Sequence, residues 1–222
     1  MRSQALEDLF LDELGEIYDA EKRMYKGLGQ LSKAAVNAGL KSALDRHKKQ
    51  TREHIRRLEE AFRLLNEEPK DGKAPGISVL LKQGLALAHK DTFDPAVVDA
   101  GLIASAQKLE HYEIAAYGCV RTHAGILGYQ EIETLLDQNL REEEHAAALL
   151  TQVAETVNAA AAAAPYAQAR TGTRHGLGQI MIGDHDQESE KPVSLGKLAL
   201  GLALGGVLSL LLFPRIYPPE RH

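Results

Sequence analysis

Apolar side chains recur with a period close to 3.5 residues through four long segments of this chain. Residues 4–37, 41–66, 94–127 and 129–160 show this spacing, which is typical of amphipathic helices. A shorter apolar segment covers residues 77–89. The alternating pattern of β-strands is almost absent. The sequence therefore predicts an all-α protein with four long helices and a short one.

The ends of the predicted helices are marked by residues that favour turns. Asn37-Ala38-Gly39 and Gly128 are typical helix stops, and Pro95 suits the first turn of a helix. The segment EEPKDGKAPG makes the connection between the second and third long helices much longer than the other two. Four apolar faces of this length predict a ferritin-like four-helix bundle, in which a long crossover joins two helical hairpins.

The chain changes character after this predicted bundle domain of residues 1–164. Residues 165–194 are polar and Gly-bearing, which predicts a linker. Residues 195–213, LGKLALGLALGGVLSLLLF, predict an apolar C-terminal helix, and residues 214–222 form a tail. At about 1.5 Å per residue this helix would span roughly 28 Å, close to the hydrocarbon core of about 30 Å. A membrane anchor and a helix packed on the bundle both remain open.

Charge and composition narrow the class of protein. The net charge is -5, and the basic residues are scattered among acidic ones in the sequence, so we expect no nucleic-acid partner. Cys119 is the only cysteine, which excludes an intrachain disulfide and fits a reducing compartment. The N-terminus MRSQALEDLFLDELGE lacks the apolar run of a signal peptide. We expect a cytoplasmic protein, with residues 195–213 as a possible attachment to the inner membrane.

Each predicted long helix carries polar residues where its apolar stripe should continue. They are Glu21 in the first helix, His47, Thr51 and His54 in the second, with Gln50 on the flank, Glu110, Glu113 and Tyr117 in the third, and Asn139 and Glu143 in the fourth. All lie near mid-helix, so antiparallel packing would bring them to one level. Four buried carboxylates beside two histidines are costly unless they bind cations. The pattern predicts two metal ions, iron or manganese, held by Glu and His of facing helices.

Each of these residues also has an ordinary structural explanation. Glu21 alone could be a slightly rotated surface residue, and His47 and His54 could be core histidines bonded to a neighbouring carboxylate. Tyr117 and Tyr18 could donate hydrogen bonds or electrons to a metal site, but aromatic packing explains them equally well. The metal hypothesis depends on the conjunction across four helices.

The segment EEEH, residues 142–145, contains a Glu-x-x-His spacing. This spacing occurs in dimetal bundles, but the same residues also suit a solvated helix face. We expect solvation for Glu144.

Four segments of the chain, LFLDELGEIYDAEKRM, HKKQTREHIRRLE, AQKLEHYEIAAYG and NLREEEH, resemble the bacterial ferritin-like family whose members are called YciE and YciF. The resemblance covers about residues 4–158, and EHYEIAAYG and YDAEK are its most specific pieces. It implies a ferritin-like bundle, usually a homodimer, with a rubrerythrin-like dinuclear metal site, in stress-associated bacterial proteins.

Carried onto this sequence, the resemblance implies the metal ligands Glu21, Glu110, Glu113 and Glu143, with Glu113 as a plausible bridge. The second helix departs from the family, which often has Glu in place of Gln50 and Gln in place of His54, and which commonly has Asp in place of Ala147. His54 or His47 would then supply nitrogen ligands. We expect a dimetal protein that handles iron, oxygen or peroxide under stress, with oxidase or peroxidase-type activity. The alternative is a non-enzymatic structural or stress-interaction protein with a degenerate metal site.

Overall fold

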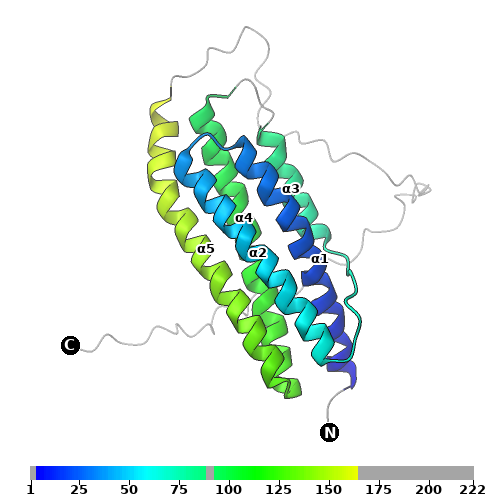
Figure 1. Ribbon diagram of the computed structural model, residues 1–222. Coiled ribbons are helices and arrows are strands. Elements are labelled where there is room, and N and C mark those ends of the chain that lie inside the picture. Colours follow the sequence, from blue (N-terminus) through cyan, green and yellow to red (C-terminus); the bar gives the residue numbers. More distant parts are fainter. Residues whose placement is uncertain (1–3, 89–92, 165–222) are drawn as a thin grey trace, which may run out of the picture. The chain divides into compact units, whose positions relative to one another are not determined.

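The computed structural model describes residues 4–88 and 93–164, and over this part of the chain its regular structure is entirely helical (Figure 1). The helices are α1 (Gln4–Ala34), α2 (Ala38–Leu64), α3 (Pro75–Ala88), α4 (Pro95–Leu127) and α5 (Gln130–Ala163). Each lies within a few residues of a segment predicted from the apolar period. The prediction of an all-α fold is therefore confirmed.

The helix ends follow from local capping. Asn37 begins α2, because its side chain accepts a hydrogen bond of 3.0 Å from the backbone N–H of Leu40. The second helix consequently starts three residues before its predicted position. Asp94 caps α4 in the same way. Gly128 ends α4 in the left-handed conformation, with φ 76°, which glycine adopts without steric cost.

The long helices form two antiparallel hairpins, α1–α2 and α4–α5, and the connection between the hairpins contains α3 (Figure 1). Helices α1 and α5 each pack against both α2 and α4, whereas α3 packs against α1 and α4. This arrangement of two hairpins and a long crossover is that of a ferritin-like bundle, as the sequence predicted.

The crossover approaches α1 most closely at Gly72. Its backbone N–H donates a hydrogen bond of 2.9 Å to the carbonyl of Gly15, and the carboxylate of Asp19 accepts another of 3.0 Å from Ala74. A Cβ atom on Gly72 would lie 2.4 Å from the backbone nitrogen of Glu16. Only glycine fits this position without displacing the backbone.

We expect Gly72→Ala to destabilise the protein by about 1–3 kcal/mol, because the added methyl group must push the crossover away from α1. Gly118→Ala in α4 is the matched control. No atom lies within 4 Å of a Cβ at Gly118, so alanine should stabilise the helix by about 0.5–1 kcal/mol. Urea unfolding measures both changes. Equal stability of Gly72→Ala and the wild type would contradict the close packing of the crossover.

The interior of the bundle contains two apolar clusters. One includes Met24, Leu28, Leu31, Leu44, Leu102 and Leu150, and the other includes Phe10, Leu14, Leu58, Phe62, Val120 and Leu136. Between them along the four long helices lies a set of buried polar side chains, here called the polar layer: Glu21, His47, Thr51, His54, Glu110, Glu113, Asn139 and Glu143. The core is therefore apolar at both ends and polar in the middle.

Several predictions from the sequence lie outside the described residues. They are the linker at 165–194, the apolar helix at 195–213 with its possible membrane anchor, and the tail at 214–222. Among the helices that the structure does describe, none combines the length and apolar character that a membrane span requires.

Candidate metal centre

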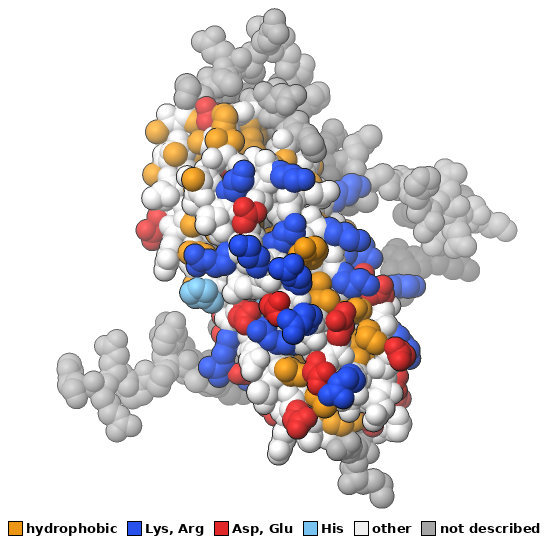
Figure 2. Space-filling model, viewed as in Figure 1, with side chains coloured by type: hydrophobic (Ala, Val, Ile, Leu, Met, Phe, Trp, Pro, Cys, Tyr) orange, Lys and Arg blue, Asp and Glu red, His pale blue; other side chains and the backbone are white. Residues whose placement is uncertain are grey.

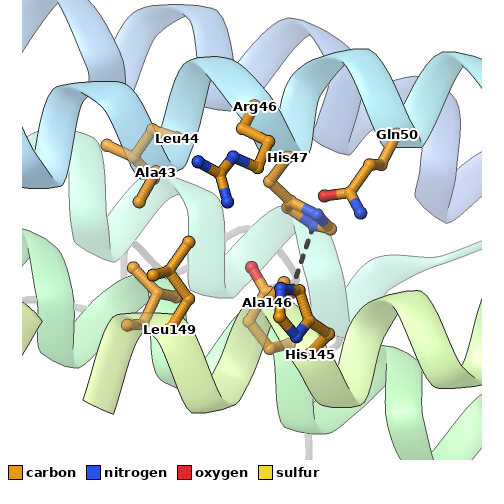
Figure 3. A pocket seen from close by; sticks show the side chains of 10 residues that line it. Ala43, Leu44, Arg46, His47, Gln50, His145, Ala146 and Leu149 are labelled. Carbon is orange, nitrogen blue, oxygen red and sulfur yellow. Dashed lines mark ion pairs between the residues drawn. The ribbon is translucent and has the colours of Figure 1, made fainter. Parts of the chain in front are cut away.

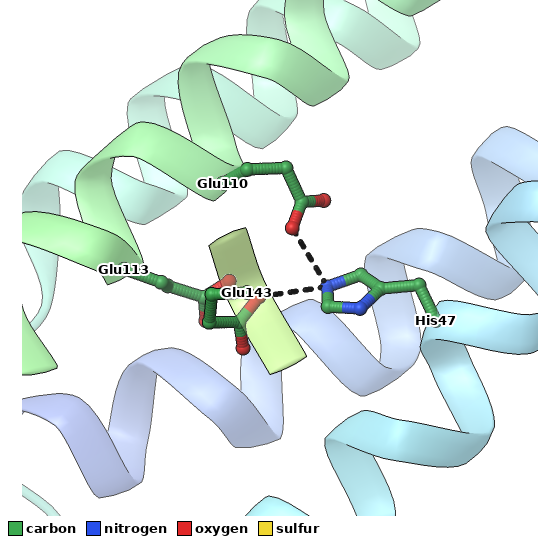
Figure 4. A group of neighbouring side chains, drawn as sticks. All are labelled: His47, Glu110, Glu113 and Glu143. Atoms are coloured by element: carbon green, nitrogen blue, oxygen red, sulfur yellow. Dashed lines mark ion pairs between the residues drawn. The ribbon is translucent and has the colours of Figure 1, made fainter. Parts of the chain in front are cut away.

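Four side chains from three helices converge in the polar layer and form what we call the first group (Figure 4). They are His47 of α2, Glu110 and Glu113 of α4, and Glu143 of α5, and each offers one ligand atom within 4.8 Å of the others. His47 Nε2 lies 3.1 Å from Glu110 Oε2 and 3.3 Å from Glu143 Oε2. Ligands about 2 Å from a common ion lie at most about 4 Å apart. The first group is close to the size that one ion requires.

A second group is formed by Glu21 of α1, His54 of α2 and the same Glu143 of α5. His54 Nδ1 lies 3.1 Å from Glu21 Oε1 and 2.8 Å from Glu143 Oε1. The two oxygens of Glu143 thus face different groups, Oε2 toward His47 and Oε1 toward His54. This geometry is that of a carboxylate able to bridge two ions, whereas Glu113, the bridge suggested by the sequence, belongs to the first group alone.

The polar atoms of the first group are buried and lack hydrogen bonds. Both carboxylate oxygens of Glu110, Glu113 and Glu143 have no hydrogen-bond partner among the described residues, and neither ring nitrogen of His47 has one. A buried polar group without a partner costs about 1–3 kcal/mol, and a charged one costs more. Such a concentration of oxygen and nitrogen lone pairs fits a divalent cation, which would satisfy several of them at once.

Burial makes most of the carboxyl groups hard to ionise in the metal-free protein. It raises the pKa of Glu110 well above the usual range, and the adjacent Glu143 raises it further. Burial also raises the pKa of Glu113 strongly, with Glu21 as the next cause. The pKa of Glu21 itself rises for the same reason, although His54 opposes the shift. These carboxyl groups therefore bind protons more tightly than exposed ones do, and a metal ion would compete with those protons.

The pKa values of Glu143 and His54 shift in the direction that favours the charged form of each side chain. Burial acts against ionisation of Glu143, but the nearby His47 and His54 outweigh it, so the pKa of Glu143 is lowered. Burial likewise acts against the His54 cation, but Glu21, Glu142 and Glu143 outweigh it and raise the pKa of His54 well above its usual value. The shared carboxylate is thus the one held ionised.

The outer edge of His54 is held by a surface ion pair. Its Nε2 lies 3.0 Å from Glu142 Oε2, and Glu142 Oε1 accepts a hydrogen bond of 2.8 Å from Arg57. The bond to His54, aided by Arg57, lowers the pKa of Glu142 to about 2. An Nε2–H that donates to this carboxylate leaves Nδ1, which faces Glu21 and Glu143, available for a metal ion.

Tyr117 lies directly against the second group. Its hydroxyl donates a hydrogen bond of 2.5 Å to Glu21 Oε1 and accepts one of 2.9 Å from Asn139 Nδ2. Burial, followed by the charge of Glu21, raises the pKa of Tyr117 well above its usual value. Tyr18, which the sequence suggested for a similar role, instead donates to Glu59 at 3.1 Å, and burial and Glu59 raise its pKa to about 12.

Two positions on α2 differ from the expected ligand pattern. Gln50, a sequence-predicted ligand, carries a neutral amide and is a half-buried residue that lines a small cavity beside His47. Thr51 is fully buried, and its hydroxyl donates a hydrogen bond of 3.1 Å to the carbonyl of His47. Neither residue supplies a carboxylate from α2.

Dimetal bundles of the ferritin type use Glu-x-x-His from two helices. On the buried faces of this chain the corresponding positions are Thr51-x-x-His54 in α2 and Glu143-x-x-Ala146 in α5. The Glu-x-x-His spacing noticed in the sequence, which starts at Glu142, is displaced by one residue from the buried face.

Sequence reasoning missed Glu142 and Arg57. The sequence suggests that Glu142 could belong to a solvated face, but its exposed fraction is 29% and it contacts His54. A signal was available: Arg57 follows His54 by three residues, which places both on neighbouring positions of one helix face. Glu142, the acidic residue next to Glu143 on the facing helix α5, is the natural partner of Arg57 and His54.

The helices and the buried layer of glutamate and histidine define a ferritin-like four-helix bundle. The chain belongs to the family described as domain of unknown function DUF892, whose model matches residues 5–163. The family resemblance seen in the sequence is thereby confirmed.

Two relatives show how far the similarity extends. Protein YciF of Escherichia coli K12 is 34% identical over 158 residues, which cover 69% of this chain and 93% of YciF. The crystal structure of YciF, described as a stress protein, matches 71% of this chain and 99% of its own with a TM-score of 0.67. YcfI of Rhodopseudomonas palustris, described as having a proposed structural role, matches 67% of this chain and 94% of its own with a TM-score of 0.64 and 37% identity.

Proposed function

We propose that the bundle binds a pair of redox-active metal ions, iron or manganese, in its polar layer. One ion would be held by the first group and the other by the second, with Glu143 shared between them. The observation that carries this proposal is the set of buried carboxylate oxygens without hydrogen-bond partners at Glu110, Glu113 and Glu143. Mixed carboxylate and imidazole ligands suit iron and manganese, and four carboxylates balance the charge of two divalent ions.

When bound, such ions supply electron exchange with oxygen or peroxide. The residues of the chain would hold the ions, keep most bulk water away and orient His54 through Glu142. The description of YciF as a stress protein supports a role for this chain under stress. The handling of iron, oxygen or peroxide follows from the proposed ions alone.

Elemental analysis of the purified full-length protein, before and after exposure to ferrous iron without oxygen, tests the proposal. We expect about two iron or manganese ions per chain. The second group offers fewer ligands than the first, so we expect its ion to bind more weakly. Protein that stays metal-free when offered ferrous iron would contradict the proposal.

A structural or stress-interaction role is the second candidate function. It is favoured by Thr51 and Ala146, which stand where a complete dimetal motif has Glu and His, and by the description of YcfI. A homodimer, expected from the family resemblance, would suit either role and stays a prediction. A strain that carries Glu110→Ala tests this candidate. If the variant protein no longer binds metal but the strain tolerates stress as well as the wild type does, the structural role is favoured.

Stability of the metal-free protein should fall as the pH rises from about 5 to 8. The pKa values of Glu110, Glu113 and His54 are raised in the folded state. The stabilisation that these groups give to the folded state is therefore complete below their ordinary pKa values. It is lost as the pH rises through their raised pKa values. The lowered pKa of Glu143 acts in the opposite direction, but below this window.

Metal should reverse the trend, because ions displace the protons and bind more tightly as the pH rises. Urea unfolding at several pH values, with and without manganese, measures both effects. Metal-free protein that becomes more stable between pH 5 and 8 would contradict the raised pKa values of these carboxyl groups.

A further inference from the structure

Arg57 of α2 connects two chains of hydrogen bonds that end at the same candidate metal ligands. Lys and Arg side chains gather on the face of the bundle shown in Figure 2, and Arg56, the residue before Arg57, has 69% of its side chain exposed. The side chain of Arg57 is only 23% exposed. Its Nη1 donates a hydrogen bond to Asn139 Oδ1 and its Nη2 donates one to Glu142 Oε1, each at 2.8 Å. The planar guanidinium thus joins two side chains that lie three residues apart on α5.

The first chain runs from Arg57 through Asn139 and Tyr117 to Glu21. A guanidinium group only donates hydrogen bonds, so Asn139 Oδ1 accepts from it and Asn139 Nδ2 faces Tyr117. Nδ2 donates to the Tyr117 hydroxyl oxygen at 2.9 Å, and the hydroxyl donates to Glu21 Oε1 at 2.5 Å. The other oxygen of Glu21, Oε2, is buried and has no hydrogen-bond partner among the described residues. The chain therefore occupies one oxygen of Glu21 and leaves the other available for an ion.

The second chain runs from Arg57 through Glu142 to His54. Glu142 accepts from Arg57 through Oε1, and its Oε2 lies 3.0 Å from His54 Nε2. An ionised carboxylate only accepts hydrogen bonds, so Nε2 of His54 carries a hydrogen. Nδ1 of His54 lies 3.1 Å from Glu21 and 2.8 Å from Glu143. Both chains end at the second group, and the donor-only guanidinium of Arg57 sets the direction of the hydrogen bonds in each.

The first group lacks such a connection among the residues that the structure describes. A small cavity lies beside His47 and is lined by the exposed residues Arg46 and His145 (Figure 3). His47 Nδ1 is buried and has no hydrogen-bond partner in the described part of the chain. A change at Arg57 should therefore affect the second group and leave the first group largely intact.

We propose that Arg57 is a positioning residue for the second group. Its guanidinium keeps a hydrogen on His54 Nε2 and directs the Tyr117 hydroxyl toward Glu21, so that the remaining ligand atoms face one ion. This inference rests on the proposed metal centre and deepens it by naming a residue that determines the affinity of one of the two positions. Arg57 belongs to neither group and acts through Asn139 and Glu142.

Titration of the full-length protein with cobalt(II), whose visible spectrum depends on its ligands, tests this role. We expect Arg57→Met to lower the affinity for the second equivalent of cobalt by about tenfold or more, the effect typical of residues that orient ligands. The affinity for the first equivalent should change by less than about twofold. Arg57→Lys keeps the charge but cannot donate to Asn139 and Glu142 in one plane, so it should also weaken the second position several-fold.

Arg56→Met is the matched control. Arg56 is the adjacent residue of α2 and pairs with Glu53 at 2.6 Å on the exposed side of the helix. The same substitution there should leave both cobalt affinities at their wild-type values.

Chemical rescue separates positioning from a loss of packing. Arg57→Ala removes the side chain, and millimolar guanidinium chloride should restore the second cobalt affinity several-fold, whereas the same concentration of sodium chloride should not. A further measurement needs no metal: proton NMR follows the exchange of the His54 Nε2 hydrogen with water. We expect this exchange to be several-fold faster in metal-free Arg57→Met than in the metal-free wild type or Arg56→Met.

Wild-type affinity for the second cobalt ion in Arg57→Met would overturn the inference, as would equal losses at both positions or an equal loss in Arg56→Met. Wild-type exchange of the His54 hydrogen in Arg57→Met would overturn it as well. If the wild type binds no cobalt, the metal centre itself fails, and the exchange rates still decide whether Arg57 holds His54. The two failures are therefore distinguishable.

Discussion

Glu143→Gln should abolish metal binding at both positions of the polar layer. Glu143 is the residue that the two groups share, with Oε1 2.8 Å from His54 Nδ1 and Oε2 3.3 Å from His47 Nε2. Glutamine keeps the size of the side chain but removes the charge. Loss of residues that merely orient ligands lowers metal affinity about 10–100-fold, and we expect a larger loss here because the ligand itself is changed.

Glu144→Gln is the matched control for this prediction. Glu144 is the next residue of α5 and is exposed, so the same chemical change should leave both metal positions intact. Anaerobic titration with ferrous iron or manganese measures the stoichiometry and affinity of each variant. Binding of two ions by Glu143→Gln would show that the shared carboxylate is not a ligand.

Glu113→Leu should make the metal-free protein more stable while weakening its metal binding. Glu113 is fully buried and neither of its oxygens has a hydrogen-bond partner among the described residues. A buried polar group without a partner costs about 1–3 kcal/mol, so an apolar side chain of similar volume should bring a gain of about that size. The wild type should gain stability when manganese is added, and the variant should gain much less.

Glu155→Leu provides the comparison on the surface of α5, where the same substitution should change stability by no more than about 0.5 kcal/mol. Urea unfolding with and without metal measures all three proteins. A metal-free Glu113→Leu protein that is less stable than the wild type would mean that the carboxyl group contributes to packing rather than to ion binding.

The opposite effects expected at Glu113 express a general property of this bundle. Its apolar clusters lie on either side of the polar layer, so the layer interrupts a core that could have been continuous. A layer of this kind destabilises the metal-free fold. Bound ions would offset that cost, because they bind the folded state and stabilise it.

The sequence predicted which side chains face the polar layer because helical periodicity alone decides this. Glu21, Glu110 and Glu143 lie in register with the apolar residues of their helices, and the structure buries all three. The same periodicity could not place Gln50, which lies at the flank of its stripe. A small rotation of α2 decides whether such a residue reaches the layer or the cavity wall.

Side-chain contacts between helices could not be predicted from the sequence for a different reason. The division of the layer into two groups, with Glu143 common to both, depends on side-chain conformations that no spacing specifies. The contact of His54 with Glu142 depends on the relative heights of α2 and α5. The start of α2 was predicted late because Asn37 can either end one helix or cap the next, and the cap prevails.

Anomalous diffraction from crystals loaded with ferrous iron under anaerobic conditions is the most direct test of the metal centre. We predict two peaks inside the bundle, one bounded by His47, Glu110, Glu113 and Glu143, and the other by Glu21, His54 and Glu143. The absence of peaks from the polar layer, with iron only at surface carboxylates, would contradict it.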